Sequence, residues 1–102
     1  PELPDAKRSR YEAAGITPYN AGVLTAEVET ARWFDALLEA GAPAVQASNW
    51  VTGELFGALN RLGKGIEDSP VAPAQAAELL ALVADGTLSG SLAKQVFELM
   101  LE

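Results

Sequence analysis

Four glycines, at positions 15, 41, 63 and 86, divide this sequence into segments whose apolar residues recur with the period of an α-helix. The segment before Gly41 shows the pattern, because spacings of three or four residues separate Val28, Ala31, Phe34 and Leu38. Glycine is favoured just past a helix end because it takes a positive φ at no steric cost. The pattern therefore predicts successive helices, each ended by a glycine.

These segments predict an all-α fold, a compact bundle of about five helices. The composition agrees, because 49% of the residues are hydrophobic and only 7% are aromatic, as in alanine- and leucine-rich packed helices. We expect Asp5, Thr25 and Ser89 to be N-caps, with helices over 5–15, 25–41, 43–63, 73–86 and from 89 on. A short additional helical turn is expected near Pro18, limited by Gly22. Residues 63–72 are predicted to form the one long connection.

The predicted helix over 43–63 contains two glycines, Gly53 and Gly57, although each costs about 1 kcal/mol relative to alanine in a helix. With Asn49 and Asn60 they follow spacings of four, four and three, which places all four residues on one side. Because small residues let a second segment approach closely, we expect this side to be a helix-packing face. Trp50, like the other tryptophan, is expected in the core or at its edge, with base stacking as the alternative.

The residue types that the chain lacks exclude most kinds of catalytic centre. It contains no cysteine and no histidine, which excludes thiolate nucleophiles, imidazole bases and the usual zinc sites. We therefore expect no catalytic residue and no metal site. The apolar runs are too short to span a membrane, so a cytoplasmic location is expected.

The charge balance argues against a domain that holds nucleic acid mainly by electrostatic attraction. The net charge is -7 and the isoelectric point is about 4.4, whereas phosphate contacts need clustered lysine and arginine. The charge is nevertheless uneven, because Lys7, Arg8 and Arg10 lie within the first ten residues. Such clusters are usually solvated helix surface.

Four ordered blocks span the sequence: LPDAKRSRY, AGVLT, NWVTGELFGALN, and IEDSPVAPAQAAELLALVADGTLSGSLAKQVFELM. Together they resemble the helical domain of the B subunit of the bacterial-type aspartyl/glutamyl-tRNA amidotransferase, the GatB type. The resemblance runs from about Leu3 to the end of the chain. Its most specific parts are Asn49-Trp50, Gly53-Glu54-Leu55, Asn60, Asp85-Gly86-Thr87, Ser89-Gly90 and Ala93-Lys94.

The resemblance implies that residues 1–102 are a single helical domain of a longer subunit, without its cradle domain upstream and its YqeY-related tail domain downstream. In that family the cradle binds ATP and magnesium, activates the misacylated Glu or Asp on the tRNA as an acyl phosphate, and receives ammonia made by the A subunit. The parent would be a carbon–nitrogen ligase, a glutamine-dependent amidotransferase. The implied partners are tRNA and the A and C subunits, with no membrane and no DNA. The domain itself would be inactive and would hold no cofactor.

The implied task of the domain is to position Glu-tRNA(Gln) or Asp-tRNA(Asn) for ATP-dependent transamidation in protein biosynthesis. The chain departs from the family at Ser91, where a basic residue is common, and at Ala72, where a threonine cap is common. The alternative is a spacer or protein-interaction domain that links cradle and tail without touching RNA, which the acidic isoelectric point favours. The candidate tRNA contacts are Lys7, Arg8, Arg10, Arg61, Lys64 and Lys94.

Overall fold

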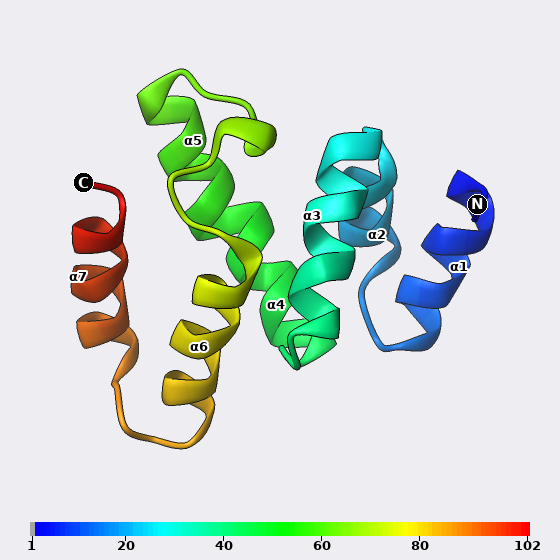
Figure 1. Ribbon diagram of the computed structural model, residues 1–102. Helices are drawn as coiled ribbons and strands as arrows, with labels where there is room; N and C mark the ends of the chain where they lie inside the picture. Colours follow the sequence, from blue (N-terminus) through cyan, green and yellow to red (C-terminus); the bar gives the residue numbers. More distant parts are fainter. Residues whose placement is uncertain (1) are drawn as a thin grey trace.

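The protein is built from helices over residues 2–102, the part of the chain that this computed structural model describes (Figure 1). A π-helical turn, η1 (Val51–Leu55), joins α4 to α5 in one continuous helix, and a 3₁₀ turn, η2 (Ile66–Asp68), precedes α6. The predicted all-α class is confirmed, with α2 where the short turn near Pro18 was expected. The α-helices are α1 (Pro4–Ala13), α2 (Pro18–Thr25), α3 (Val28–Glu39), α4 (Ala44–Trp50), α5 (Phe56–Leu62), α6 (Pro73–Ala84) and α7 (Gly90–Met100).

Each of the four predicted glycine stops follows a helix and has a positive φ. The angle is +100° at Gly15, +101° at Gly41, +68° at Gly63 and +83° at Gly86. Residues with a side chain are strained in this region, and no other residue within 2–102 occupies it. These four chain reversals therefore depend on glycine.

Of the three predicted N-caps, Ser89 is confirmed, whereas Asp5 and Thr25 are wrong. Ser89 caps α7, because its Oγ accepts a hydrogen bond from the Leu92 backbone N–H at 3.1 Å. α1 instead begins at Pro4, with Leu3 at the N-cap position, so Asp5 lies in the first turn. Proline suits the first helical position because its φ is already helical and its missing N–H would have no partner there.

Helix α2 is longer than the sequence predicts. Gly22 lies inside it, and the helix ends at Thr25. The helix continues because Ala21 and Leu24, about one turn apart, are both fully buried, and the Thr25 hydroxyl donates to the Ala21 carbonyl at 2.8 Å. The prediction of Thr25 as the N-cap of α3 is therefore wrong, and Glu27 occupies that position.

Helix α6 begins without a hydroxyl side chain at its N-cap. Ala72 is at the N-cap position and offers no side-chain acceptor. The Gln75 side chain accepts a hydrogen bond from the Ala72 backbone N–H at 2.9 Å, which is half of a capping box. Gln75 thus satisfies one of the donors at the start of α6.

Helix α3 lies at the centre of the packing and links the two ends of the molecule. It contacts α2, α4, η2 and α6, whereas α1 packs mainly on α2, and α7 packs on α6. Figure 1 shows α1 at one edge of the bundle and α7 at the other. α1 and α7 are therefore edge helices. The largest fully buried apolar side chains come from four of the helical segments and the connection before α6: Tyr11, Leu24, Phe34, Leu37, Val51, Leu55 and Val71.

The long connection between α5 and α6 is packed onto the bundle. Ile66 is 7% exposed, Val71 is fully buried, and the Ser69 hydroxyl accepts from the Val71 N–H at 3.1 Å. The Cα radius of gyration of 13.0 Å equals the value of about 13 Å for compact chains of 100 residues. Within residues 2–102 there is no helix of the length and hydropathy needed to cross a bilayer.

Candidate functional site

Two of the predicted RNA-contact residues, Lys7 and Arg10 on α1, are engaged by carboxylates of the chain itself. Lys7 Nζ lies 2.6 Å from Asp35 Oδ2, and Arg10 Nη2 lies 2.9 Å from Asp35 Oδ1 and 2.8 Å from Glu2 Oε1. The Tyr11 hydroxyl donates to Asp35 Oδ1 at 2.6 Å. We call these five residues the Asp35 network. The network ties α1 to α3 and occupies both cations.

The ionisation of Asp35 follows from its neighbours. Burial alone would raise the pKa of Asp35, but hydrogen bonds from Lys7, Tyr11 and Arg10 outweigh burial, so the pKa lies below its ordinary value. Burial, followed by the hydrogen bond to Asp35, raises the pKa of Tyr11. At neutral pH Asp35 is therefore charged and Tyr11 is a hydrogen-bond donor.

Three further predicted contact residues also face carboxylates, although they are exposed. The two Nη atoms of Arg61 lie 3.1 and 3.0 Å from the two carboxylate oxygens of Glu98. Arg8 pairs at 3.6 and 3.9 Å with two acidic residues of its own helix. Lys94 Nζ lies 3.8 Å from Glu54 Oε1. Exposed pairs of this kind contribute roughly 0–1 kcal/mol.

Five of the seven lysines and arginines form ion pairs within residues 2–102. The other two, Lys64 and Arg32, pair with no carboxylate of that range. Lys64 was predicted as a contact, and it lines a cavity of about 280 Å³ with Asn60 and Thr30. Arg32 is exposed on α3 and was missed, because it stands between acidic residues in the sequence. Lys64 is thus the predicted contact that remains free to meet a phosphate.

The predicted helix-packing face is wrong within the described part of the chain. Gly53 and Gly57 are exposed, and a Cβ added to either would meet no atom within 4 Å. Asn60 is exposed as well. Asn49 does bridge two helices, because its Oδ1 accepts from Asn20 Nδ2 of α2 at 3.2 Å. Val51, Leu55 and Leu59 of this helix are buried, and its α4 part packs on α2 and α3. The two glycines lie on the other side, toward solvent.

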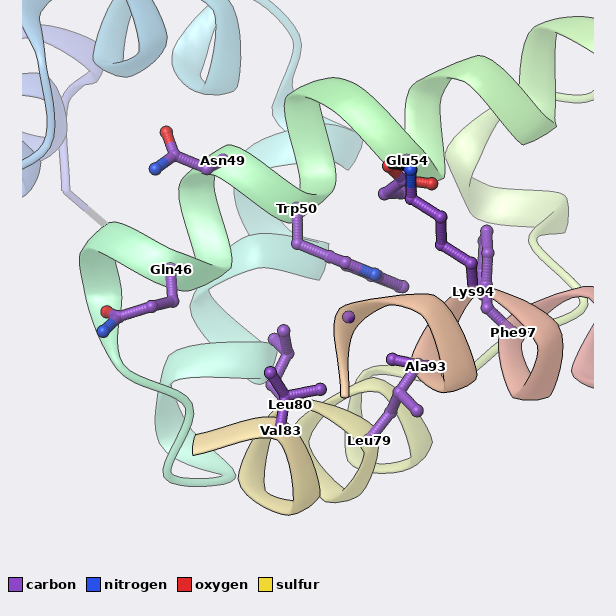
Figure 2. Close-up of a pocket in the computed structure, with 11 residues that line it drawn as sticks. Gln46, Asn49, Trp50, Glu54, Leu79, Leu80, Val83, Ala93, Lys94 and Phe97 are labelled. Carbon is purple, nitrogen blue, oxygen red and sulfur yellow. Dashed lines mark ion pairs between the residues drawn. The ribbon is translucent and has the colours of Figure 1, made fainter. Parts of the chain in front are cut away.

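A groove of about 320 Å³ lies where α4 and η1 approach α6 and α7 (Figure 2). Trp50 is half-buried along it and makes a T-shaped contact with the Phe97 ring, with 5.0 Å between centroids and 71° between planes. Trp33, in contrast, is 9% exposed within the core. The apolar lining of the groove consists of Trp50, Leu79, Leu80, Val83, Ala93 and Phe97.

The polar side chains of the groove gather at one end. Figure 2 shows the Trp50 indole extending toward Glu54 and Lys94, with its nitrogen on that side. The indole N–H makes no hydrogen bond to a residue of the range 2–102. Glu54 belongs to η1, and π-helical turns occur frequently at functional sites. The groove thus joins an apolar surface to a carboxylate, an ammonium and an indole donor.

The sequence of this chain is similar to proteins of one known family. The family model of the GatB domain matches residues 32–102. The chain belongs to the GatB domain family. The B subunit of aspartyl/glutamyl-tRNA(Asn/Gln) amidotransferase from Rhizorhabdus wittichii is 69% identical over 100% of this chain and 22% of its own length. Proteins of the same name from Novosphingobium aromaticivorans and Geobacter sulfurreducens are 65% and 54% identical, over 100% and 98% of this chain and 22% and 21% of their lengths.

This GatB-domain chain spans about a fifth of the length of these relatives. The match to the family model begins at residue 32, inside α3, so α1 and α2 lie outside that match but inside the match to the amidotransferase subunits. All residues of the groove lie inside both matches. The resemblance predicted from the sequence blocks is confirmed.

Proposed function

We propose that this chain is a non-catalytic helical domain of a tRNA-dependent amidotransferase subunit and helps to position Glu-tRNA(Gln) or Asp-tRNA(Asn) for transamidation. The observation that carries the proposal is the 69% identity to the B subunit of such an enzyme over the whole chain. The parent enzyme, a cytoplasmic carbon–nitrogen ligase, would use glutamine as its ammonia source and serve protein biosynthesis. ATP and Mg²⁺ would bind in its cradle domain, and the A and C subunits would be its partners.

The residue content of the chain supports positioning rather than chemistry. Without cysteine or histidine, the chain offers neither a thiolate nor an imidazole for acyl or proton transfer. Holding a substrate in place still accelerates a reaction, because it removes translational and rotational entropy from the barrier. A rigid helical domain outside the chemical centre can contribute in this way.

A second candidate function is a spacer or protein-interaction domain that links cradle and tail without touching RNA. Five of the seven cations form ion pairs within the chain, and the net charge is -7. Such a surface releases few counterions from RNA and therefore gains little affinity by charge. This observation favours the spacer.

The two functions are separated by replacing Lys64, one of the two cations without an ion pair in residues 2–102, in the parent subunit assembled with its A and C subunits. We expect Lys64→Ala to weaken tRNA binding and to reduce the slope of log K against log salt by about one, because one phosphate contact is lost. Arg8→Ala is the matched control, since Arg8 is paired within its own helix. Equal tRNA affinity and equal salt slopes for the wild type and all cation variants would favour the spacer.

A further inference from the structure

We propose that the groove beside Trp50 binds one unpaired nucleobase of the tRNA, stacked on the indole. This inference rests on the proposed positioning function. It adds to the unpaired Lys64 a second RNA contact, made by a neutral aromatic surface. The reasons are the state of the cations, the shape of the groove and the chemistry of its polar end.

The cations leave little attraction for the phosphate backbone. Lys7 and Arg10 are held by Asp35 at 2.6 and 2.9 Å, and the bidentate pair of Arg61 has N–O distances of 3.1 and 3.0 Å. A domain of net charge -7 can still bind RNA through bases, because a base is uncharged and stacking needs no counterion release. Single-stranded RNA is commonly recognised in this way, with unstacked bases placed on aromatic side chains.

The groove has the surface that a base requires. Its volume is about 320 Å³ and its lining is mainly apolar. Trp50 and Phe97 form an aromatic corner, with 5.0 Å between their centroids, and Trp50 is only partly buried. In Figure 2 the apolar side chains of α6 and Ala93 of α7 lie opposite the Trp50 indole. A flat ring can therefore be covered on two sides.

The polar end of the groove matches the edge of a base. A base edge presents hydrogen-bond donors and acceptors side by side. Glu54 supplies acceptors, Lys94 supplies donors, and the Trp50 N–H lacks an acceptor within residues 2–102. The Glu54–Lys94 pair is loose, with 3.8 Å between its atoms and side chains that are 42% and 70% exposed. Separating the two groups to receive a ligand therefore costs little.

An apolar polypeptide segment is the competing occupant of the same groove. Its side chains would use the apolar floor, but they would leave the mixture of donors and acceptors at the polar end unused. The rim is electrically neutral as a Glu54–Lys94 pair, which suits an uncharged ring with both kinds of hydrogen-bonding group. The observations therefore favour the base, and the test below separates the two occupants.

The experiment measures tRNA binding by the parent subunit in its assembled amidotransferase. We expect Trp50→Leu to weaken binding about five- to 150-fold, the loss expected when one base–aromatic stack is removed. The slope of log K against log salt stays unchanged, because no phosphate contact is lost. Trp50→Tyr retains most of the affinity, since a second aromatic ring can stack. Leu99→Ala is the control, because Leu99 is 67% exposed and does not line the groove.

Each alternative outcome has a distinct meaning. Wild-type affinity in a folded Trp50→Leu variant overturns the nucleobase site, while a salt-slope change in Lys64→Ala still upholds the positioning function. Loss of assembly with the A and C subunits in Trp50→Leu, with unchanged tRNA affinity of the enzyme that does assemble, identifies a polypeptide occupant and also overturns the inference. Unchanged tRNA binding in the Trp50 and Lys64 variants alike overturns the positioning function itself. Circular dichroism melting verifies the fold of every variant.

Discussion

The two edge helices, α1 and α7, are anchored in the same way, but the surfaces around their anchors differ. Each buries a single residue, Tyr11 in α1 and Phe97 in α7. Each ring makes a T-shaped contact, Tyr11 with Phe34 and Phe97 with Trp50, with centroid distances of 5.1 and 5.0 Å. Around Tyr11 the charged side chains of the Asp35 network close the surface, whereas around Phe97 the apolar surface remains open as the groove. The surface beside an edge helix can thus be closed by charged side chains, as at α1, or left open as an apolar groove, as at α7.

The largest expected effect comes from removing the anchor of α7. We expect Phe97→Ala to destabilise the protein by about 3–5 kcal/mol, because a buried ring is lost and a cavity remains. Phe97 is 3% exposed, and α7 has no other buried residue. Chemical denaturation measures the loss, and amide hydrogen exchange should show that α7 loses protection before α1 does. Equal loss of protection in both helices would show that the two edges unfold together and are not anchored independently.

The next effect concerns the charges that hold α1. We expect Asp35→Asn to destabilise the protein by about 1–3 kcal/mol, because Lys7 and Arg10 lose a charged acceptor at 2.6 and 2.9 Å. The amide cannot accept from three donors as the carboxylate does. Glu12→Gln is the control, since Glu12 only makes an exposed pair at 3.9 Å. Denaturant unfolding of both variants gives the measurement, and equal stability of the two would mean that packing alone holds α1.

The same carboxylate predicts a specific acid sensitivity. The pKa of Asp35 is lower in the folded protein than in the unfolded chain, where it is about 3.9. Its stabilising contribution is therefore complete above that pH and is lost as the pH falls through the lower folded value. Unfolding free energies measured from pH 5 down to pH 2 should fall more steeply for the wild type than for Asp35→Asn. Parallel curves would show that the Asp35 network contributes no pH-dependent stability.

Much of the fold follows from local rules that the sequence displays. Glycine at a helix end has a local cause, the positive φ, and the stops predicted at positions 15, 41, 63 and 86 were correct. The stop predicted at Gly22 was wrong, because that glycine lies inside α2. The cap at Ser89 also has a local cause, because its hydroxyl accepts a hydrogen bond from the backbone N–H three residues further on. Thr25 was placed wrongly because a threonine hydroxyl can cap a following helix or bond back to its own, and burial of Leu24 decided between the two.

The groove could not be predicted, because it depends on which helices meet. Periodicity showed that α6 and α7 are amphipathic, but it did not show that Phe97 would meet Trp50 from a segment 47 positions earlier. The ion pairs could not be predicted from the sequence either, since Arg61 and its partner Glu98 are 37 positions apart. Family resemblance supplied the function class, and only the folded arrangement separates the free Lys64 from its paired neighbours.

The smallest expected effect reverses the interpretation that the sequence suggested for Gly53 and Gly57. Neither has a positive φ, and an added Cβ meets no atom at either position. We therefore expect Gly57→Ala, in α5, to stabilise the protein by about 0.5–1 kcal/mol, because alanine loses less backbone entropy on folding. Gly53→Ala, in η1, should do so by a similar amount, because the space around an added methyl group is equally open. Gly41→Ala is the matched control and should destabilise, because its φ is +101° although the surrounding space is empty.

Denaturant titration of the three glycine variants checks these signs, and the assembled enzyme adds a sharper comparison. In the chain alone, the face that carries Gly53 and Gly57 is open, so a methyl group costs nothing there. If Gly57→Ala stabilises the chain but weakens the assembled enzyme, another segment packs against this face in the whole protein. If it stabilises both, the face is open in both. A loss of stability in the chain alone would contradict the exposed position of the two glycines and restore the close packing first expected of them.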